Sequence, residues 1–175
     1  YYGDFTTGLM FLQGDTIVRQ VNGGGYYSEK DVFGLVAYDD QRLLVGTTQD
    51  GLSLINTVTG EINAPFGDAI TNTFLVQNFL TNLRTLSNGN FIAATIHGGV
   101  AQIDREGKLV EIVSKEQSLQ DQTVWNAYES EQDYPFTNLW TAMSLGVAKI
   151  SLPSPFRKVT EDSGFQGLIH SINAI

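Results

Sequence analysis

Cysteine is absent from this chain of 175 residues, which excludes a disulfide framework, a thiolate metal site and a cysteine nucleophile. Basic residues are few: 10 Lys and Arg stand against 19 Asp and Glu, for a formal net charge of -9. A chain without a basic stripe has no means of neutralising phosphates, so we expect no nucleic-acid partner. The missing cysteines fit the cytoplasm and the periplasm equally well, so they leave the compartment open.

Long apolar runs are also missing. No run approaches the roughly 18 residues that a membrane-spanning helix needs. The first residues, Tyr1 to Asp4, have neither the basic nor the apolar region of a secretory signal peptide, so any leader or membrane anchor is expected outside these residues. The remaining composition, 42% hydrophobic and 17% charged, suits one folded domain with a sizeable core.

Glycine, by contrast, is abundant and regularly placed. There are 18 glycines and only 4 prolines. Four glycines follow a short apolar segment and begin another, at intervals of 43, 48 and 47 residues: Gly8, Gly51, Gly99 and Gly146. An interval of this size is the length of one blade of a β-propeller.

The segments around these glycines can be aligned with one another. Residues 44–55 match residues 92–103, and residues 139–150 and 1–12 are two further copies. The third position of the alignment is small or modest in every copy, as expected where neighbouring sheets approach closely. Its occupants are Gly3, Gly46, Ala94 and Thr141.

Each unit is predicted to contain four strands joined by tight turns. In one unit the strands are expected at residues 33–38, 44–48, 52–56 and 61–66, and in the next at residues 83–86, 91–95, 100–104 and 108–113. Dipeptides such as Asp50-Gly51 and Asn88-Gly89 supply the positive φ of two-residue hairpin turns, so the strands are expected to be antiparallel hairpins in series.

The sequence therefore predicts an all-β chain: a single β-propeller segment of about four four-stranded antiparallel blades, three complete and one split between the chain ends. The units are expected at about residues 1–30, 31–77, 78–122 and 123–166, with residues 167–175 beginning another blade. Crossover helices, which an α/β fold needs, are not expected because helical periodicity is scarcely visible. A β-sandwich fits the number of strands but does not explain the repeat.

The split unit has two interpretations. Residues 168–172 either pair with residues 1–21 and close a four-bladed ring, or the segment belongs to a larger propeller. We expect the second, because small propellers lie at the low end of the roughly 4 to 8 blade range. An open arc exposes the apolar faces of its end blades, so self-association is expected.

At this point the residues resemble a known family, the two-component regulator propeller repeats of bacterial membrane signalling proteins. Residues 139–147 follow its pattern Leu-Trp-small-small-x-x-x-Gly-apolar, and residues 154–165 resemble its link to the next blade. The tryptophan that is most characteristic of this pattern occurs in only one of the four copies. The resemblance implies a periplasmic sensor region, with a transmembrane helix and a cytoplasmic output in other parts of the protein. It also implies glycan-type ligands, without assigning them to residues.

Catalytic signals are weak. His97 lies in a turn and His170 has no Cys or His nearby, so neither predicts a catalytic or metal site. The acidic pairs, such as Asp39-Asp40 and Glu161-Asp162, lie in turns that favour Asp. Residues 22–25 and 106–109 lack the context of nucleotide-binding loops, and there is no Gly-x-Ser-x-Gly motif. We expect no catalytic residues, no metal and no cofactor.

A ligand site is expected on the face that carries the turns between second and third strands and the links between blades. Aromatic side chains are the other candidates for ligand contact. Trp140 is expected in the core between blades, and Trp125 is expected either in that core or in contact with a ligand. Tyr26-Tyr27, Tyr128 and the extended hairpin with Tyr134 and Phe136 complete the aromatic set. The predicted ligand-binding residues are Gln49, Asp50, His97, Trp125 and Ser144, together with the 72–78 link.

The predicted function is that of a non-enzymatic sensor segment of a bacterial signal-transduction protein. It is expected to be periplasmic, to bind an unidentified small molecule, glycan-type ligand or protein, and to meet a membrane only through other parts of its protein. Two alternatives stay open: a propeller enzyme such as a lyase or glycosidase, and a scaffold with protein partners only. The enzyme requires His, acidic and basic residues or a metal to converge on one channel.

Overall fold

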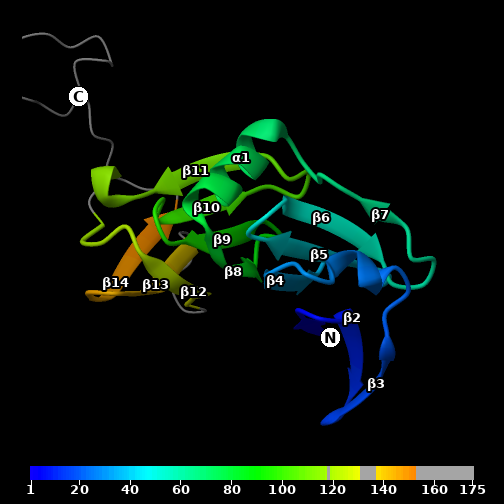
Figure 1. Ribbon diagram of the computed structural model, residues 1–175. Coiled ribbons are helices and arrows are strands. Elements are labelled where there is room, and N and C mark those ends of the chain that lie inside the picture. The colour runs from blue at the N-terminus through cyan, green and yellow to red at the C-terminus, as the bar shows by residue number, and fades with distance from the viewer. Residues whose placement is uncertain (118, 131–136, 153–175) are drawn as a thin grey trace, which may run out of the picture.

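The computed structural model describes residues 1–117, 119–130 and 137–152 of the chain (Figure 1). These residues form three β-sheets, one α-helix and two short 3-10 helices. No helix in the described ranges is long and apolar enough to cross a membrane. The all-β class is confirmed, whereas the four-blade propeller arrangement and the unit boundaries stay predictions.

The largest sheet contains two units of four strands each. The first unit is β4 (Val32–Ala37), β5 (Arg42–Thr47), β6 (Gly51–Asn56) and β7 (Ile62–Asn63). The second is β8 (Leu80–Thr85), β9 (Phe91–Thr95), β10 (Val100–Ile103) and β11 (Leu109–Val113). Each unit is an antiparallel meander, and the first strands of the two units pair in parallel at Gly34 and Leu83.

Two three-stranded sheets stand at the ends of this pair of units (Figure 1). One contains β1 (Tyr2–Asp4), β2 (Gly8–Gln13) and β3 (Thr16–Gln20), which correspond to the second, third and fourth strands of a unit. The other contains β12 (Val124–Glu129), β13 (Thr137–Met143) and β14 (Gly146–Leu152), the first three strands of a unit. The rest of this predicted unit, residues 153–166, and residues 167–175 lie outside the described residues.

Glycine at the turns between second and third strands is required by the backbone. Gly51 and Gly99 have φ of 78° and 73°, a region that disfavours L side chains. A Cβ at Gly99 would also collide with the carbonyl of Val113. The repeated glycines that revealed the unit length therefore mark one recurring turn geometry.

Three apolar clusters bind the four units in a row. The first lies between β1–β3 and β4–β7 and includes Leu9, Val45 and Ile55. The second lies between β4–β7 and β8–β11 and includes Leu44, Leu52 and Phe91. The third lies between β8–β11 and β12–β14 and includes Ile92, Val124 and Leu139. Alternate residues of a central strand thus pack toward opposite neighbours, as in a strand that is buried on both faces.

The predicted alignment of residues 139–150 with the other units is wrong by one residue in β13. Leu44 faces Leu54 and Ile92 faces Gln102, but the equivalent Lys149 faces Trp140 rather than Leu139. By strand register, the turn between β13 and β14 is one residue shorter than the corresponding turns of the two preceding units. A one-residue shift in strand register moves each side chain of β13 to the opposite face of the sheet. Leu139 is fully buried, and Trp140, expected in the core, is 47% exposed on the outward face.

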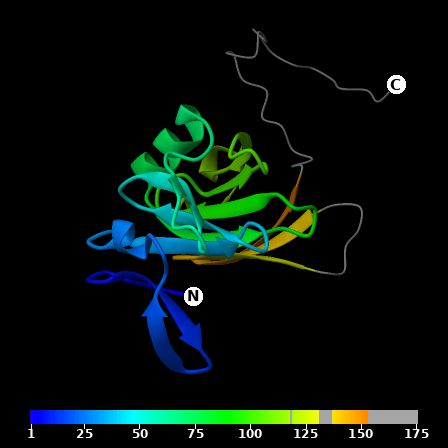
Figure 2. The same ribbon diagram turned by 90° about the vertical axis from the view of Figure 1, so that its right-hand side faces the viewer.

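Two further expectations are corrected. The strand predicted at residues 61–66 is limited to Ile62–Asn63, and Pro65, which has no N–H to donate, follows it. No helix was expected between units, but the 72–78 link lies within helix α1 (Ala69–Asn78). Figures 1 and 2 show α1 and the β2–β3 hairpin on opposite sides of the molecule. The other helices are the short η1 (Gly24–Tyr27) and η2 (Lys115–Gln117).

The beginning of α1 is predicted to be sensitive to acid. The amide of Thr71 donates to Asp68 Oδ1 at 2.8 Å, and hydrogen bonds from Thr71 hold the pKa of Asp68 below its ordinary 3.8. A lowered pKa in the folded state stabilises the helix above pH 3.8, and this stabilisation is lost as the pH falls through the lowered value.

The test is an acid titration of the α1 Cα chemical shifts by NMR. In the wild type we expect the first turn of α1 to fray as Asp68 is protonated. Asp68→Asn is the matched control, since asparagine caps a helix without titrating. An equal response of the two proteins to acid would contradict the prediction.

Candidate ligand-binding face

One end of the row of units carries the turns and links that the sequence predicts for a ligand site. In a meander, the turn between the second and third strands lies at the same end as the link to the next unit. We call this end the turn face. Its turns are residues 5–7, 48–50, 96–99 and 144–145, and its links are residues 21–31, 64–79 and, in the described part, 114–117 with 119–123.

Backbone hydrogen bonds join each turn to a neighbouring link. The amides of Ile96 and His97 donate to the carbonyl of Asn78 at 3.0 and 3.1 Å. The amide of Ser144 donates to Thr123 at 3.3 Å, and that of Thr48 donates to Asp31 at 3.3 Å. Because the same connection recurs from unit to unit, the turn face is a continuous hydrogen-bonded surface rather than a set of separate loops.

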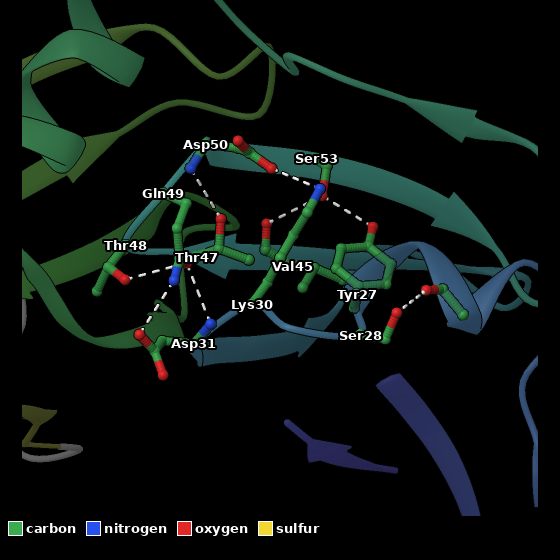
Figure 3. A network of polar contacts seen from close by, with 11 residues as sticks. Tyr27, Ser28, Lys30, Asp31, Val45, Thr47, Thr48, Gln49, Asp50 and Ser53 are labelled. Atoms are coloured by element: carbon green, nitrogen blue, oxygen red, sulfur yellow. Dashed lines mark hydrogen bonds and ion pairs between the residues drawn. The ribbon is translucent and has the colours of Figure 1, made fainter. Parts of the chain in front are cut away.

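Lys30 is the centre of a charged contact on this face (Figure 3). Its Nζ lies 2.6 Å from Asp50 Oδ2 and 3.4 Å from the centroid of the Tyr26 ring. Partial burial by itself lowers the pKa of Lys30, but its hydrogen bonds to Asp50 and Tyr26 outweigh this effect and the pKa is raised. The ammonium group is therefore held in its charged form between a carboxylate and an aromatic face.

Gln49 is a second connection between the turn and the link (Figure 3). Its Oε1 accepts from the amide of Asp31 at 3.1 Å, and its Nε2 donates to Asp31 Oδ2 at 3.0 Å. Beneath the face, Tyr27 and Ser53 share a hydrogen bond of 2.8 Å, and burial raises the pKa of Tyr27 to about 12. Gln49 and Asp50, predicted as ligand contacts, thus also hold the link in place.

The remaining predicted residues occupy two other places on the face. His97 is exposed and its ring meets that of Phe79 edge to face at 5.6 Å. The indole Nε1 of Trp125 donates to Ser144 Oγ at 3.1 Å, so these two predicted residues are brought together. Tyr134 and Phe136 of the extended hairpin, and His170, lie outside the described residues.

Lys30 and Asp31 were not predicted from the sequence. Neither residue belongs to a motif, and their role depends on how the 21–31 link folds over the turn at residues 48–50.

Elsewhere, Asp39 accepts a hydrogen bond from Arg42 Nε at 2.7 Å within a turn at the opposite end of its unit. Within the described residues, no group of three or more His, Asp or Glu side chains could hold a metal ion.

Comparisons with known proteins give the fold. No protein-family model and no curated protein matches the chain. A solved structure described as the extracellular domain of the hybrid two-component system BT3049 from B. thetaiotaomicron matches 74% of this chain with 21% identity and a TM-score of 0.56. The chain has the fold of part of this domain. It spans only 16% of the length of that solved chain.

Two further solved structures share this fold. The extracellular domain of the system BT4673 from B. thetaiotaomicron matches 70% of this chain, with 15% identity and a TM-score of 0.52, and the match covers 15% of that solved chain. PorZ, a surface component of the type-IX secretion system of Porphyromonas gingivalis, matches 66% with 14% identity and a TM-score of 0.52, over 17% of its length. The likeness agrees with the resemblance drawn from the sequence and, at these identities, concerns the fold.

Proposed function

We propose that the chain is an arc of a β-propeller in the periplasmic sensor region of a bacterial membrane signalling protein, of the two-component regulator propeller type. The observation that carries the proposal is the row of repeated units joined by three apolar clusters, in a fold shared with the extracellular domains of the systems BT3049 and BT4673. The sequence pattern at residues 139–147 supports the same assignment.

The proposed role is binding without catalysis. On the turn face, the carboxylate of Asp50 is paired with Lys30, and that of Asp31 accepts from Gln49. Carboxylates engaged in this way support the structure of the face rather than proton transfer to a substrate. A ligand or partner bound there would act by favouring one packing of units or protomers over another, and this difference would be transmitted to the membrane-linked output.

The ligand-binding part of the proposal is tested by changing two turns together. A binder would first be found among glycan fragments and other small molecules by its effect on the melting temperature. We expect Asp50→Ala combined with His97→Ala to weaken its binding. Asp40→Ala, an exposed acid in a turn at the opposite end of a unit, is the matched control. Unchanged affinity in the double variant would refute binding at these turns.

A second proposal concerns the outward face of β12–β14, which we call the end face. Trp140 and Val147 on this face are 47% and 64% exposed. By register they correspond to Ile92 and Val100, which are buried in the cluster toward the next unit. We therefore propose that the end face packs against another four-stranded unit, and that the isolated chain uses a second copy of itself for this purpose.

A further inference from the structure

The first sheet of the row exposes an apolar face of its own. Tyr2 of β1 lies opposite Met10 of β2, and Leu12 of β2 lies opposite Ile17 of β3. Residues that are paired across strands, or that lie two apart along one strand, share a face of the sheet, so these four side chains lie together. Tyr2 and Ile17 are 48% and 53% exposed. We call this surface the front face.

The front face is the counterpart of a face that is buried elsewhere in the row. By the register of β1 with β2 and of β5 with β6, Tyr2 is the counterpart of Val45. In the same way Leu12 is the counterpart of Ile55 in β6. Both counterparts are fully buried in the apolar cluster that faces the preceding unit. The front face is therefore the side on which a unit of this chain packs against the unit before it.

The end face has the opposite direction. Trp140 lies opposite Tyr128, which is 57% exposed, and Ala142 lies opposite Val147. As described above, the counterparts of Trp140 and Val147 are buried toward the following unit. Figure 1 shows the two end sheets on opposite sides of the row, so the front face and the end face do not meet within one copy.

Contacts between these two kinds of face already hold the chain together. Each of the three apolar clusters joins the side of one unit that faces forward to the side of the next unit that faces backward. An end face packed against the front face of a second copy would repeat this geometry. Two end faces packed against each other would repeat none of the contacts between the described units.

The charges of the two faces favour the same direction. Asp4 lies two residues after Tyr2 in β1, on the side of the front face. Lys149 lies opposite Trp140 on the side of the end face. An end face against a front face brings an acidic and a basic residue to one interface, whereas a symmetric contact brings like charges to it.

We propose that copies of this chain associate head to tail, with the end face of one copy packed against the front face of the next. The inference rests on the self-association proposed for the end face and identifies the surface of the second copy that it contacts. A two-fold contact uses one surface twice and stops at a dimer. A head-to-tail contact leaves one face of each kind open and adds further copies until a ring closes.

Two double variants test the direction of the contact. One carries Trp140→Asp with Val147→Asp and keeps its front face, and the other carries Tyr2→Asp with Ile17→Asp and keeps its end face. Alone, each should raise the dissociation constant by about tenfold or more, because carboxylates would be buried without partners. Mixed in equal amounts, the two variants should form a dimer in sedimentation velocity, since one intact front face meets one intact end face.

Each variant alone at the same total concentration is the matched control for the mixture. Far-ultraviolet circular dichroism checks that both variants fold, and serine at the same positions replaces aspartate in a variant that does not. A front-face variant that assembles like the wild type, or a mixture of folded variants that stays monomeric, would overturn the inference.

The outcomes separate this inference from the other proposals. Assembly of the front-face variant by itself would leave the end-face contact standing as a symmetric dimer. A wild type that stays monomeric would overturn both the direction and the end-face contact. Binding at the turn face is tested separately by the Asp50 and His97 double variant.

Discussion

Replacing Phe91 with alanine is expected to destabilise the chain by about 3–5 kcal/mol, the usual cost of removing a large buried aromatic side chain. Phe91 is fully buried in the cluster between the β4–β7 and β8–β11 units. Its ring stacks with Tyr38 at 6.2 Å between centroids. Arg105 contacts both rings: its guanidinium carbon lies 4.1 Å from the centroid of Tyr38 and 5.5 Å from that of Phe91, and its Nη2 donates to the carbonyl of Tyr38 at 2.7 Å.

Urea denaturation measures this effect as a lower midpoint with an unchanged slope. A loss of this size is a large part of the free energy of unfolding of a typical domain, which is roughly 5–15 kcal/mol. Phe33→Ala is the matched control, because the same residue type is removed from an exposed position, and its cost should stay below about 1 kcal/mol. Equal effects of the two substitutions would contradict the stacking of units through these clusters.

The second large effect is expected on self-association. Introducing charge on the end face through Trp140→Asp together with Val147→Asp should raise the dissociation constant of the proposed assembly by about tenfold or more. The reason is that two unpaired carboxylates would be buried in an apolar contact. Sedimentation velocity measures the change as a lower weight-average mass at the same concentration.

The control for this experiment is Ile70→Asp, which places a carboxylate on α1 at a residue that is 70% exposed. It should leave the assembly unchanged, because α1 is not on the end face. Dissociation by Ile70→Asp to the same degree would mean that another surface carries the association. An assembly that tolerates both charges on the end face would refute the proposed contact.

The parts of the fold that could be predicted from the sequence are those with a local cause. Strand β9 runs over Phe91–Thr95 as predicted, because a β-rich apolar run is bounded there by turn signals. The glycines at the hairpin turns were found because a positive φ selects glycine wherever the turn recurs. Both features depend on a few neighbouring residues only.

The features that were missed depend on distant contacts. Helix α1 has no amphipathic pattern, and its buried Asn72 is held by a side-chain hydrogen bond to the amide of Leu52 at 2.7 Å. The shift in β13 comes from a turn that is one residue shorter, which an alignment without gaps hides. The β-bulges at Phe33 in β4, Thr81 in β8 and Trp125 in β12 leave no mark in composition or spacing, because they are defined by the partner strand.

The candidate site was predicted in part for the same reason. Turn positions such as Asp50 and His97 follow from strand order alone, and the structure places both on the turn face. The pairing of Asp50 with Lys30 needs the link to fold back over the turn, and no residue pattern indicates this contact. Trp125 was singled out as an aromatic residue, but its exposure on a bulge could be found only from strand register.

The most direct test of an open arc of stacked units is the mass of the wild-type chain by light scattering over a hundredfold range of concentration. The exposed end face predicts a mass above that of the 19.2 kDa chain that rises with concentration. A sharply defined monomer across the whole range would contradict the open arc and would favour a ring closed by the chain itself.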